Sequence, residues 1–377
     1  MIELDGSDGG GQLVRTALTL SALRGEPFRM EGVRGDRSTP GLKRQHLACV
    51  EAVAALTDAA VEGDAVGSET LTFEPAVEPG SPGGPADVAV DVGTAGSVTL
   101  VADTLLPLAV RLRTPVRASL VGGTDVRWAP STAYLRRVKL PLLRRLGLDA
   151  TVDPVRRGFY PAGGGELAVE IRPSSLDPVD LRPGGDAASN PGSAAASDAG
   201  GEATPVTGRD GRASVHAIAA AGLETDDVAE RVAEATEAEL DDRGIVDDVP
   251  ATATYADADS TGVALTVAID GDSGAGRDAD PAPRAGFVGY GGADADPESL
   301  ADTTADAVER WAGTAAPVDA HLADQLVVWL ALAGGSVPTP RVTDHVRTNV
   351  ALVRAFGYDV SIDRRPDGAS VVAELTD

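Results

Sequence analysis

Histidine is scarce in this chain, and His345 has the most suggestive surroundings of the four. It lies in RVTDHVRTNVALV, where Val350 and Val353 repeat at helical spacing, so we expect a helix from Asn349 onward. The question is whether its imidazole takes part in chemistry. The alternative interpretation is that His345 is a polar residue at an ordinary helix start.

A second group of polar residues stands in VDAHLADQLVVWLALAGG, residues 318–335. His321, Asp324 and Gln325 fall in the first turn of a very apolar predicted helix. Residues three and four apart share a helix face, so the three side chains can act together. An acid in a first turn is also common simply because it favours the helix dipole.

The segment RGDRSTPGLKRQH, residues 34–46, carries five basic side chains in thirteen residues. Guanidinium groups match phosphate oxygens in geometry and charge. A solvated charged loop is the usual alternative. Because this cluster interrupts an acidic protein, we favour phosphate contact.

Glycine-rich turns precede two of the predicted helices. DGSDGGGQ (5–12) and GTAGS (93–97) could both bring backbone N–H groups close to an anion. The first run fits neither the dinucleotide-binding nor the P-loop consensus, and a role as a simple turn stays open. RGFYPAGGGELAVEI (157–171) is equally consistent with a hairpin connection.

The formal net charge of −26 is unevenly distributed. Residues 1–50 hold seven Lys or Arg against six Asp or Glu, and residues 127–157 hold eight against two, whereas residues 183–283 hold 21 acids and five bases. A phosphate-bearing partner is therefore not excluded by the overall charge.

With two lysines against 30 arginines, we expect a surface adapted to molar salt, where the Debye length is about 3 Å. Full stability in dilute buffer would contradict this hypothesis.

The composition, 43% hydrophobic, allows a substantial core. No apolar run reaches a membrane-spanning length, and the first residues lack a signal-peptide pattern, so we expect a cytoplasmic protein without membrane contact. Cys49 is the single cysteine and sits in an apolar context, which predicts a core residue and excludes an internal disulfide.

An internal repeat organises the chain. Apolar helices are predicted within 9–27, 94–115 and 321–338, and each is followed by a second helix, within 39–56, 129–147 and 339–357. Each second helix begins just after a proline. His46, Tyr134 and His345 follow those prolines closely, so we expect them in equivalent, polar positions.

Residues 183–212 and 271–284 are poor in large apolar residues and predict linkers. Between them we expect strands at 213–218 and 262–269 and an acidic helix at 226–243. The sequence thus predicts an α/β protein with a large domain, 1–182 and 284–377, and a small acidic domain, 183–283, inserted between the second and third repeats.

Seven motifs, in order, resemble the RNA 3′-terminal phosphate cyclase family over residues 2–182 and 284–375: LDGSDGGGQLVRTALTLS, VRGDRSTPGLKRQHL, GTAGSVTL, GGTDVRWAP, RGFYPAGGG, HLADQLVVWLALAGG and HVRTNV. The resemblance implies three β-α-β-α-β-β units with a small α/β domain inserted after the second. It also implies ATP-dependent conversion of an RNA 3′-terminal phosphate to a 2′,3′-cyclic phosphate. AMP and diphosphate would be released, through a covalent histidine–AMP and an RNA–adenylate anhydride.

The resemblance assigns roles to particular residues. His345, in the H-x-x-T-N stretch, is implied as the nucleophile. The implied nucleotide contacts are His321, Leu322, Ala323, Asp324, Gln325, Asp103 and Pro130; the implied contacts to phosphate or the RNA end are Arg34, Arg37, Gln45, His46 and Arg15; and Asp8 is the implied ligand of Mg²⁺ or Mn²⁺.

Two departures from the family pattern concern acids. Asp8 stands where the family has a glutamate, which puts the position of the metal in question. Asp103 stands where glutamine is usual, and it would repel a triphosphate unless a cation lies between them. His321 stands where tyrosine is common, which argues against His321 as the nucleophile.

Two alternative functions belong to related architectures. A non-catalytic cyclase-like RNA-binding protein of ribosome assembly would lack the nucleophilic histidine, and His345 is present. An enolpyruvyl transferase shares the repeated units but would lack the inserted domain and would need no covalent adenylate. No pattern in the sequence predicts an oligomeric state.

Overall fold

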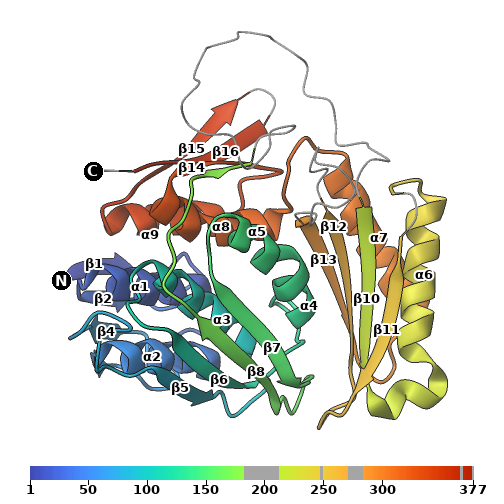
Figure 1. The fold of residues 1–377 in the computed structure, drawn as a ribbon, viewed down its shortest axis with the longest axis horizontal. Helices are drawn as coiled ribbons and strands as arrows, with labels where there is room; N and C mark the ends of the chain where they lie inside the picture. The colour runs from blue at the N-terminus through green and yellow to red at the C-terminus, as the bar shows by residue number, and fades with distance from the viewer. Residues whose placement is uncertain (182–211, 247–248, 271–282, 366–367, 376–377) are drawn as a thin grey trace.

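The computed structural model describes residues 1–181, 212–246, 249–270, 283–365 and 368–375. These residues form four four-stranded mixed sheets together with the helices that pack against them (Figure 1). The α/β class predicted from the sequence is confirmed. None of the helices in the described ranges is long and apolar enough to cross a membrane.

Three of the sheets belong to units with the same order of elements. The first unit comprises β1 (Ile2–Asp5), α1 (Gly11–Arg24), β2 (Phe28–Glu31), α2 (Arg44–Thr57), β3 (Ala60–Glu62) and β4 (Leu71–Glu74). The second comprises β5 (Asp87–Asp91), α3 (Val98–Leu105) with a 3₁₀ extension (Leu106–Val110), β6 (Val116–Gly122), α4 (Thr132–Tyr134), a π-helical turn (Leu135–Lys139), α5 (Leu140–Arg145), β7 (Ala150–Arg156) and β8 (Gly165–Ile171). The third comprises β9 (Val179–Asp180), α8 (Ala320–Ala333), β14 (Gly335–Thr339), α9 (Asp344–Ala355), β15 (Asp359–Arg365) and β16 (Gly368–Glu374).

The strand pairing is also the same in the three units. The first strand runs parallel to the second, the second is antiparallel to the fourth, and the fourth is antiparallel to the third. Corresponding helices therefore begin at corresponding places, which is the geometry that the repeated sequence segments require.

The fourth sheet, in the order β11-β10-β12-β13, has its own helices. Its elements are β10 (Arg212–Ala220), a 3₁₀ turn (Ala221–Asp226), α6 (Val228–Asp242), β11 (Ala251–Ala256), β12 (Val263–Asp270), β13 (Pro283–Gly291) and α7 (Pro297–Ala312). In α6, Val228, Val232 and Leu240 are buried while acids occupy the other face, so an amphipathic helix covers the sheet.

The boundaries of this inserted part differ from those expected. We expected the large domain to resume at residue 284, but β13 pairs with β12, and Val308 and Trp311 of α7 join the core of the fourth sheet. The insertion also follows β9, which pairs with β14, so it falls inside the third unit. The linkers expected at 183–212 and 271–284 lie almost wholly outside the described residues.

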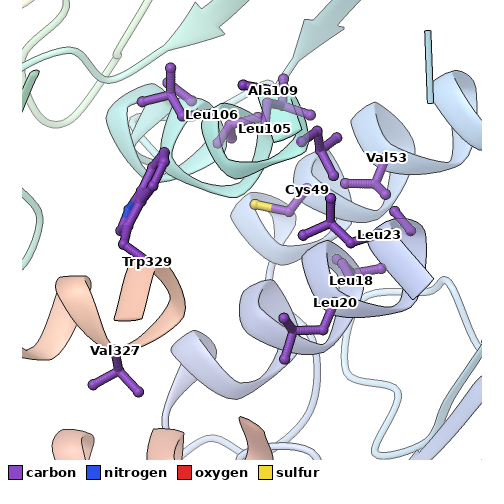
Figure 2. Close-up of a cluster of buried hydrophobic side chains, with 14 of the residues drawn as sticks. Leu18, Leu20, Leu23, Cys49, Val53, Leu105, Leu106, Ala109, Val327 and Trp329 are labelled. Atoms are coloured by element: carbon purple, nitrogen blue, oxygen red, sulfur yellow. The ribbon is translucent and has the colours of Figure 1, made fainter. Parts of the chain in front are cut away.

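The helices of the three units pack together in the interior, with the three sheets around them (Figure 1). Figure 2 shows Leu18 of α1, Val53 of α2, Leu105 of α3 and Trp329 of α8 in this core. Cys49 lies among them, buried and unpaired, as predicted. This packing brings the starts of α1, α8 and α9 close to one another.

Candidate functional site

A cavity of about 980 Å³ lies between the three units and the fourth sheet. Side chains of α1, α3, α8 and α9 line one part of it, and residues of β13 and α7 line another. Small-molecule sites in proteins commonly have volumes of roughly 300–1,000 Å³. Of the residues singled out from the sequence, His345, His321, Asp324, Gln325, Arg15, Asp103 and Pro130 line this cavity.

At the start of α9 a residue other than His345 caps the helix. Thr343 is the cap: its Oγ1 accepts a hydrogen bond from Val346 N at 3.0 Å. The same hydroxyl donates to Asp324 Oδ1 at 2.5 Å, which ties α9 to α8. The His345 side chain remains 48% exposed, with its Nδ1 3.7 Å from Asp324 Oδ2.

The surroundings of His345 favour a neutral imidazole. Burial lowers its pKa, and the positive charges of Arg37 and Arg15 lower it further. Burial raises the pKa of Asp324 to about 6, against the opposing effect of the Thr343 hydrogen bond. Because Nδ1 faces the Asp324 carboxylate, a proton on Nδ1 is favoured, which leaves the lone pair on Nε2.

The first turn of α8 contributes further polar groups to the cavity. His321 and Gln325 line it on either side of Asp324, as their helical spacing predicted. Gln325 Oε1 is buried and has no hydrogen-bond partner among the described residues, so it can accept a hydrogen bond from a ligand. Leu322 and Ala323 are fully buried in the core, so their side chains do not reach the cavity.

Asp319, the cap of α8, fixes that first turn. Its Oδ1 accepts hydrogen bonds from His321 N at 2.8 Å and Leu322 N at 3.0 Å. Its Oδ2 accepts from Tyr134 Oη and from Gly286 N, each at 3.0 Å. One buried carboxylate therefore joins α8 to the second unit and to β13, and burial raises its pKa.

Asp103 would repel a bound triphosphate unless a cation lay nearby, and the structure places a lysine beside it. Lys139 Nζ lies 2.9 Å from Asp103 Oδ1, and both side chains are buried. Burial lowers the pKa of Lys139, whereas the charge of Asp103 raises it. Arg15 is close enough to affect the same pKa, so one acid stands beside two cations in this wall of the cavity.

In the basic segment 34–46, some side chains bond to other parts of the protein, whereas Arg37 is exposed. The Arg34 guanidinium donates to Thr39 O at 2.9 Å and Gly41 O at 2.8 Å, so it supports its own loop. Gln45 Oε1 accepts from Ser97 N at 3.0 Å, which joins α2 to the second glycine-rich turn. Arg37 is exposed, and its guanidinium lies 3.1 Å from where a Cβ on Gly10 would stand, beside the start of α1.

His46 has a different environment from the one expected. It is only 6% exposed, and its Nδ1 accepts a hydrogen bond from Lys43 N at 2.9 Å. Burial, reinforced by the charge of Arg15, lowers its pKa to about 3. Tyr134 is buried as well, so of the three equivalent positions only His345 has the polar, accessible character that we expected.

The structure gives Asp8 no preformed metal site. Its side chain is exposed, and no group of three or more His, Cys, Asp or Glu suited to a metal occurs within the described ranges. Mg²⁺ is often held by one or two carboxylates together with substrate phosphates. Asp8 therefore stays a predicted ligand that would need oxygen atoms from the substrate.

Three residues of the site were missed by the sequence analysis. Thr343 and Asp319 carry the usual signal of a helix cap, an oxygen-bearing side chain just before an apolar helix, and this signal could have identified them. Lys139 had no comparable signal, because its partner Asp103 lies on another helix of the unit.

Known proteins are similar to this chain along nearly all of its length. The chain matches the family described as RNA 3′-terminal phosphate cyclase over residues 7–362. It is 43% identical to RNA 3′-terminal phosphate cyclase from Halobacterium salinarum, covering 98% of this chain and 99% of that protein. It is 35% identical to the protein of that name from Ectopseudomonas mendocina, covering 94% of this chain and 92% of that protein.

A solved structure, the enolpyruvyl transferase NikO from Streptomyces tendae, is also similar, with 17% identity and a TM-score of 0.23. It covers 45% of this chain and 33% of that chain, and this likeness supports no conclusion about fold or function. The match over residues 7–362 and the 43% identity are decisive: this chain belongs to the RNA 3′-terminal phosphate cyclase family.

Proposed function

We propose that this protein uses ATP to convert the 3′-terminal phosphate of RNA into a 2′,3′-cyclic phosphate, releasing AMP and diphosphate. The observation that carries the proposal is the position of His345. This imidazole is accessible in the wall of the cavity, it has a lowered pKa, and it faces a carboxylate on one side. Family membership supports an RNA 3′-terminal phosphate as one reactant, and ATP is the nucleotide that we propose as the other.

In the first step His345 Nε2 attacks the α-phosphorus of ATP. The bond between the α-phosphorus and the bridging oxygen breaks, and diphosphate leaves. The imidazole then carries AMP on Nε2 and a proton on Nδ1, so it is positively charged. The Asp324 carboxylate is placed to offset that charge, because its Oδ2 lies 3.7 Å from Nδ1.

In the second step an oxygen of the RNA 3′-phosphate attacks the phosphorus of the histidine-bound AMP. The phosphorus–nitrogen bond breaks, His345 is restored, and an RNA–adenylate anhydride forms. A terminal phosphate needs this activation because its charge repels nucleophiles and it has no good leaving group. Arg15 and Arg37, whose charges both act on His345, suit the incoming phosphate.

In the third step the neighbouring 2′-hydroxyl oxygen attacks the 3′-phosphorus. The bond to AMP breaks, the cyclic phosphate closes, and the hydroxyl proton passes to solvent. We assign His321, Gln325, Asp103 and Pro130 to the nucleotide because they line the same cavity as His345. A divalent cation, held by Asp8 and phosphate oxygens, would offset negative charge on the phosphates.

The proposal can be tested with a 5′-labelled RNA oligonucleotide that ends in a 3′-phosphate. Incubation with the protein, ATP and Mg²⁺ or Mn²⁺ in concentrated KCl should make the 3′ end resistant to phosphatase. A matched oligonucleotide with a 2′-deoxy terminal nucleotide should not cyclise, because it lacks the attacking oxygen. A 3′ end that stays sensitive to phosphatase, with protein that binds ATP, would contradict the proposal.

A further inference from the structure

We propose that Trp128 is a stacking platform for a nucleobase at the mouth of the cavity, an inference that rests on the proposed function. Its side chain is 96% exposed, whereas Trp311 and Trp329 are 6% and 2% exposed. Trp128 lines the same cavity as His345. Neither the reaction steps nor the packing of the core uses this indole ring.

The backbone at Trp128 is held in a conformation that bulky residues seldom adopt. Its φ is +64°, in the left-handed region that favours glycine. Strained positions of this kind persist only where the surrounding structure fixes them, and they cluster at functional sites. A glycine would adopt this conformation more easily than a tryptophan does.

The surrounding structure does fix this loop at its base. Thr132 Oγ1 donates to Thr124 O at 2.9 Å, and Thr132 N donates to Asp125 Oδ1 at 3.0 Å, which closes the loop of residues 124–132. Asp125 is fully buried, and its Oδ2 accepts from Arg157 Nη1 at 2.9 Å. The base of the loop is therefore rigidly joined to the segment that precedes β8.

The tip of the loop is anchored from the inserted part of the chain. Tyr290 Oη, from β13, donates to Ala129 O at 2.9 Å. Val126 and Ala129 are buried against Leu100, so the residues on either side of the tip point inward. Arg127 Nη2 donates to Tyr290 O at 3.3 Å. The indole of Trp128 projects from a fixed frame, so a ligand that stacks on it need not first order the loop.

A nucleobase is the ligand class that this arrangement fits best. Exposed aromatic rings beside positive charge are the usual means by which proteins hold unpaired bases. Here Arg127 is the neighbouring residue in the loop, and the cavity that Trp128 lines also contains Arg15 and Lys139, of which Lys139 is paired with Asp103. The base could be that of ATP or one at the end of the RNA, since both present the same aromatic face.

Tryptophan fluorescence can test the stacking without any covalent step. In a His345→Ala protein, which cannot form the adenylate, we would titrate ATP in one arm and an RNA oligonucleotide ending in a 3′-phosphate in the other. We expect quenching in at least one arm, and its loss when Trp128→Phe is added. An oligonucleotide whose terminal nucleotide lacks a base distinguishes stacking from phosphate binding in the RNA arm.

Affinity gives a second readout with a matched control. Trp128→Ala should weaken binding of the stacked ligand about 5- to 150-fold, while Trp128→Phe should retain most of it. Tyr160→Ala is the control, because Tyr160 is 74% exposed but does not line the cavity. Unchanged fluorescence and affinity in both arms would overturn the proposal. These are binding measurements, so their outcome is independent of whether the protein cyclises RNA.

Discussion

The second helices of the first and third units each have a histidine in the first turn, but one is buried and the other is accessible. In α2 the residue before the helix is Lys43, whose side chain has no oxygen, and His46 Nδ1 accepts the Lys43 N–H. In α9 the residue before the helix is Thr343, whose hydroxyl accepts from Val346 N, and the His345 side chain is 48% exposed. The two histidines therefore differ in exposure and in bonding: His46 is buried and bonded to the backbone, whereas His345 lines the cavity.

The second unit shows a third outcome at the corresponding place. Ser131 caps α4, and Tyr134 is fully buried, with its hydroxyl donating to Asp319. The corresponding residues of the three units therefore have three different roles. His46 bonds to the backbone at a helix end, Tyr134 joins the second unit to the third, and His345 faces the cavity. Proximity to a helix start alone does not make a residue functional.

The largest expected effect is a difference in stability between the alanine variants of the two histidines. We expect His46→Ala to lower the free energy of unfolding by roughly 2–4 kcal/mol, because it empties a buried site and leaves the Lys43 N–H without its partner. His345→Ala should change it by less than about 0.5 kcal/mol, since that side chain is half exposed. Urea unfolding at one fixed KCl concentration would measure both, and equal losses would refute the contrast.

Gly11 tests the packing that holds His46 in place. A Cβ at Gly11 would stand 2.0 Å from His46 Nε2, so Gly11→Ala should destabilise the protein by roughly 1–3 kcal/mol. Gly313→Ala is a matched control, because a Cβ there would meet only backbone oxygens at 3.7 and 3.8 Å. In a His46→Ala background the effect of Gly11→Ala should shrink. If it stays the same, the two residues do not contact each other as described.

Replacing the cap of α9 should have a smaller effect on stability. Thr343→Ala removes the acceptor for Val346 N and the donor to Asp324, and we expect a loss of roughly 0.5–2 kcal/mol. Thr343→Ser keeps the hydroxyl and should behave like the natural protein in thermal unfolding. If Ser and Ala were equally destabilising, the hydroxyl would not be what matters at this position.

The smallest expected effect is on the pH dependence of the first chemical step. Asp324 has its pKa raised to about 6, so it is a carboxylate above that pH and a neutral acid below it. The rate of protein adenylylation should fall several-fold as the pH drops through about 6. Asp324→Asn should lower the rate and remove this inflection, leaving the fall set by His345, whose pKa lies below its ordinary value. An unchanged profile would exclude this role for Asp324.

The sequence was informative where a pattern is local or repeated. The helical spacing of His321, Asp324 and Gln325 placed them together in the cavity, and the recurring helix pairs predicted corresponding helix starts. The apolar context of Cys49 correctly predicted a core residue. These features depend on neighbours in the chain, which can be read from the sequence alone.

The sequence failed where the outcome depends on distant partners. β13 was assigned to the large domain because nothing local shows that it pairs with β12. Leu322 and Ala323 were grouped with the polar residues around them, but their side chains point into the core. The burial of His46 depends on the close approach of α1 at Gly11, a contact between two helices that no sequence spacing encodes.

The most direct test of the central claim is whether His345, and not His46, becomes covalently linked to AMP. The natural protein and the two alanine variants would be incubated with α-labelled ATP and Mg²⁺ or Mn²⁺ in concentrated KCl, and protein-bound label would be measured after denaturation. We predict an acid-labile label in the natural protein, some label in folded His46→Ala, and none in His345→Ala. Label that survives in His345→Ala would contradict the account.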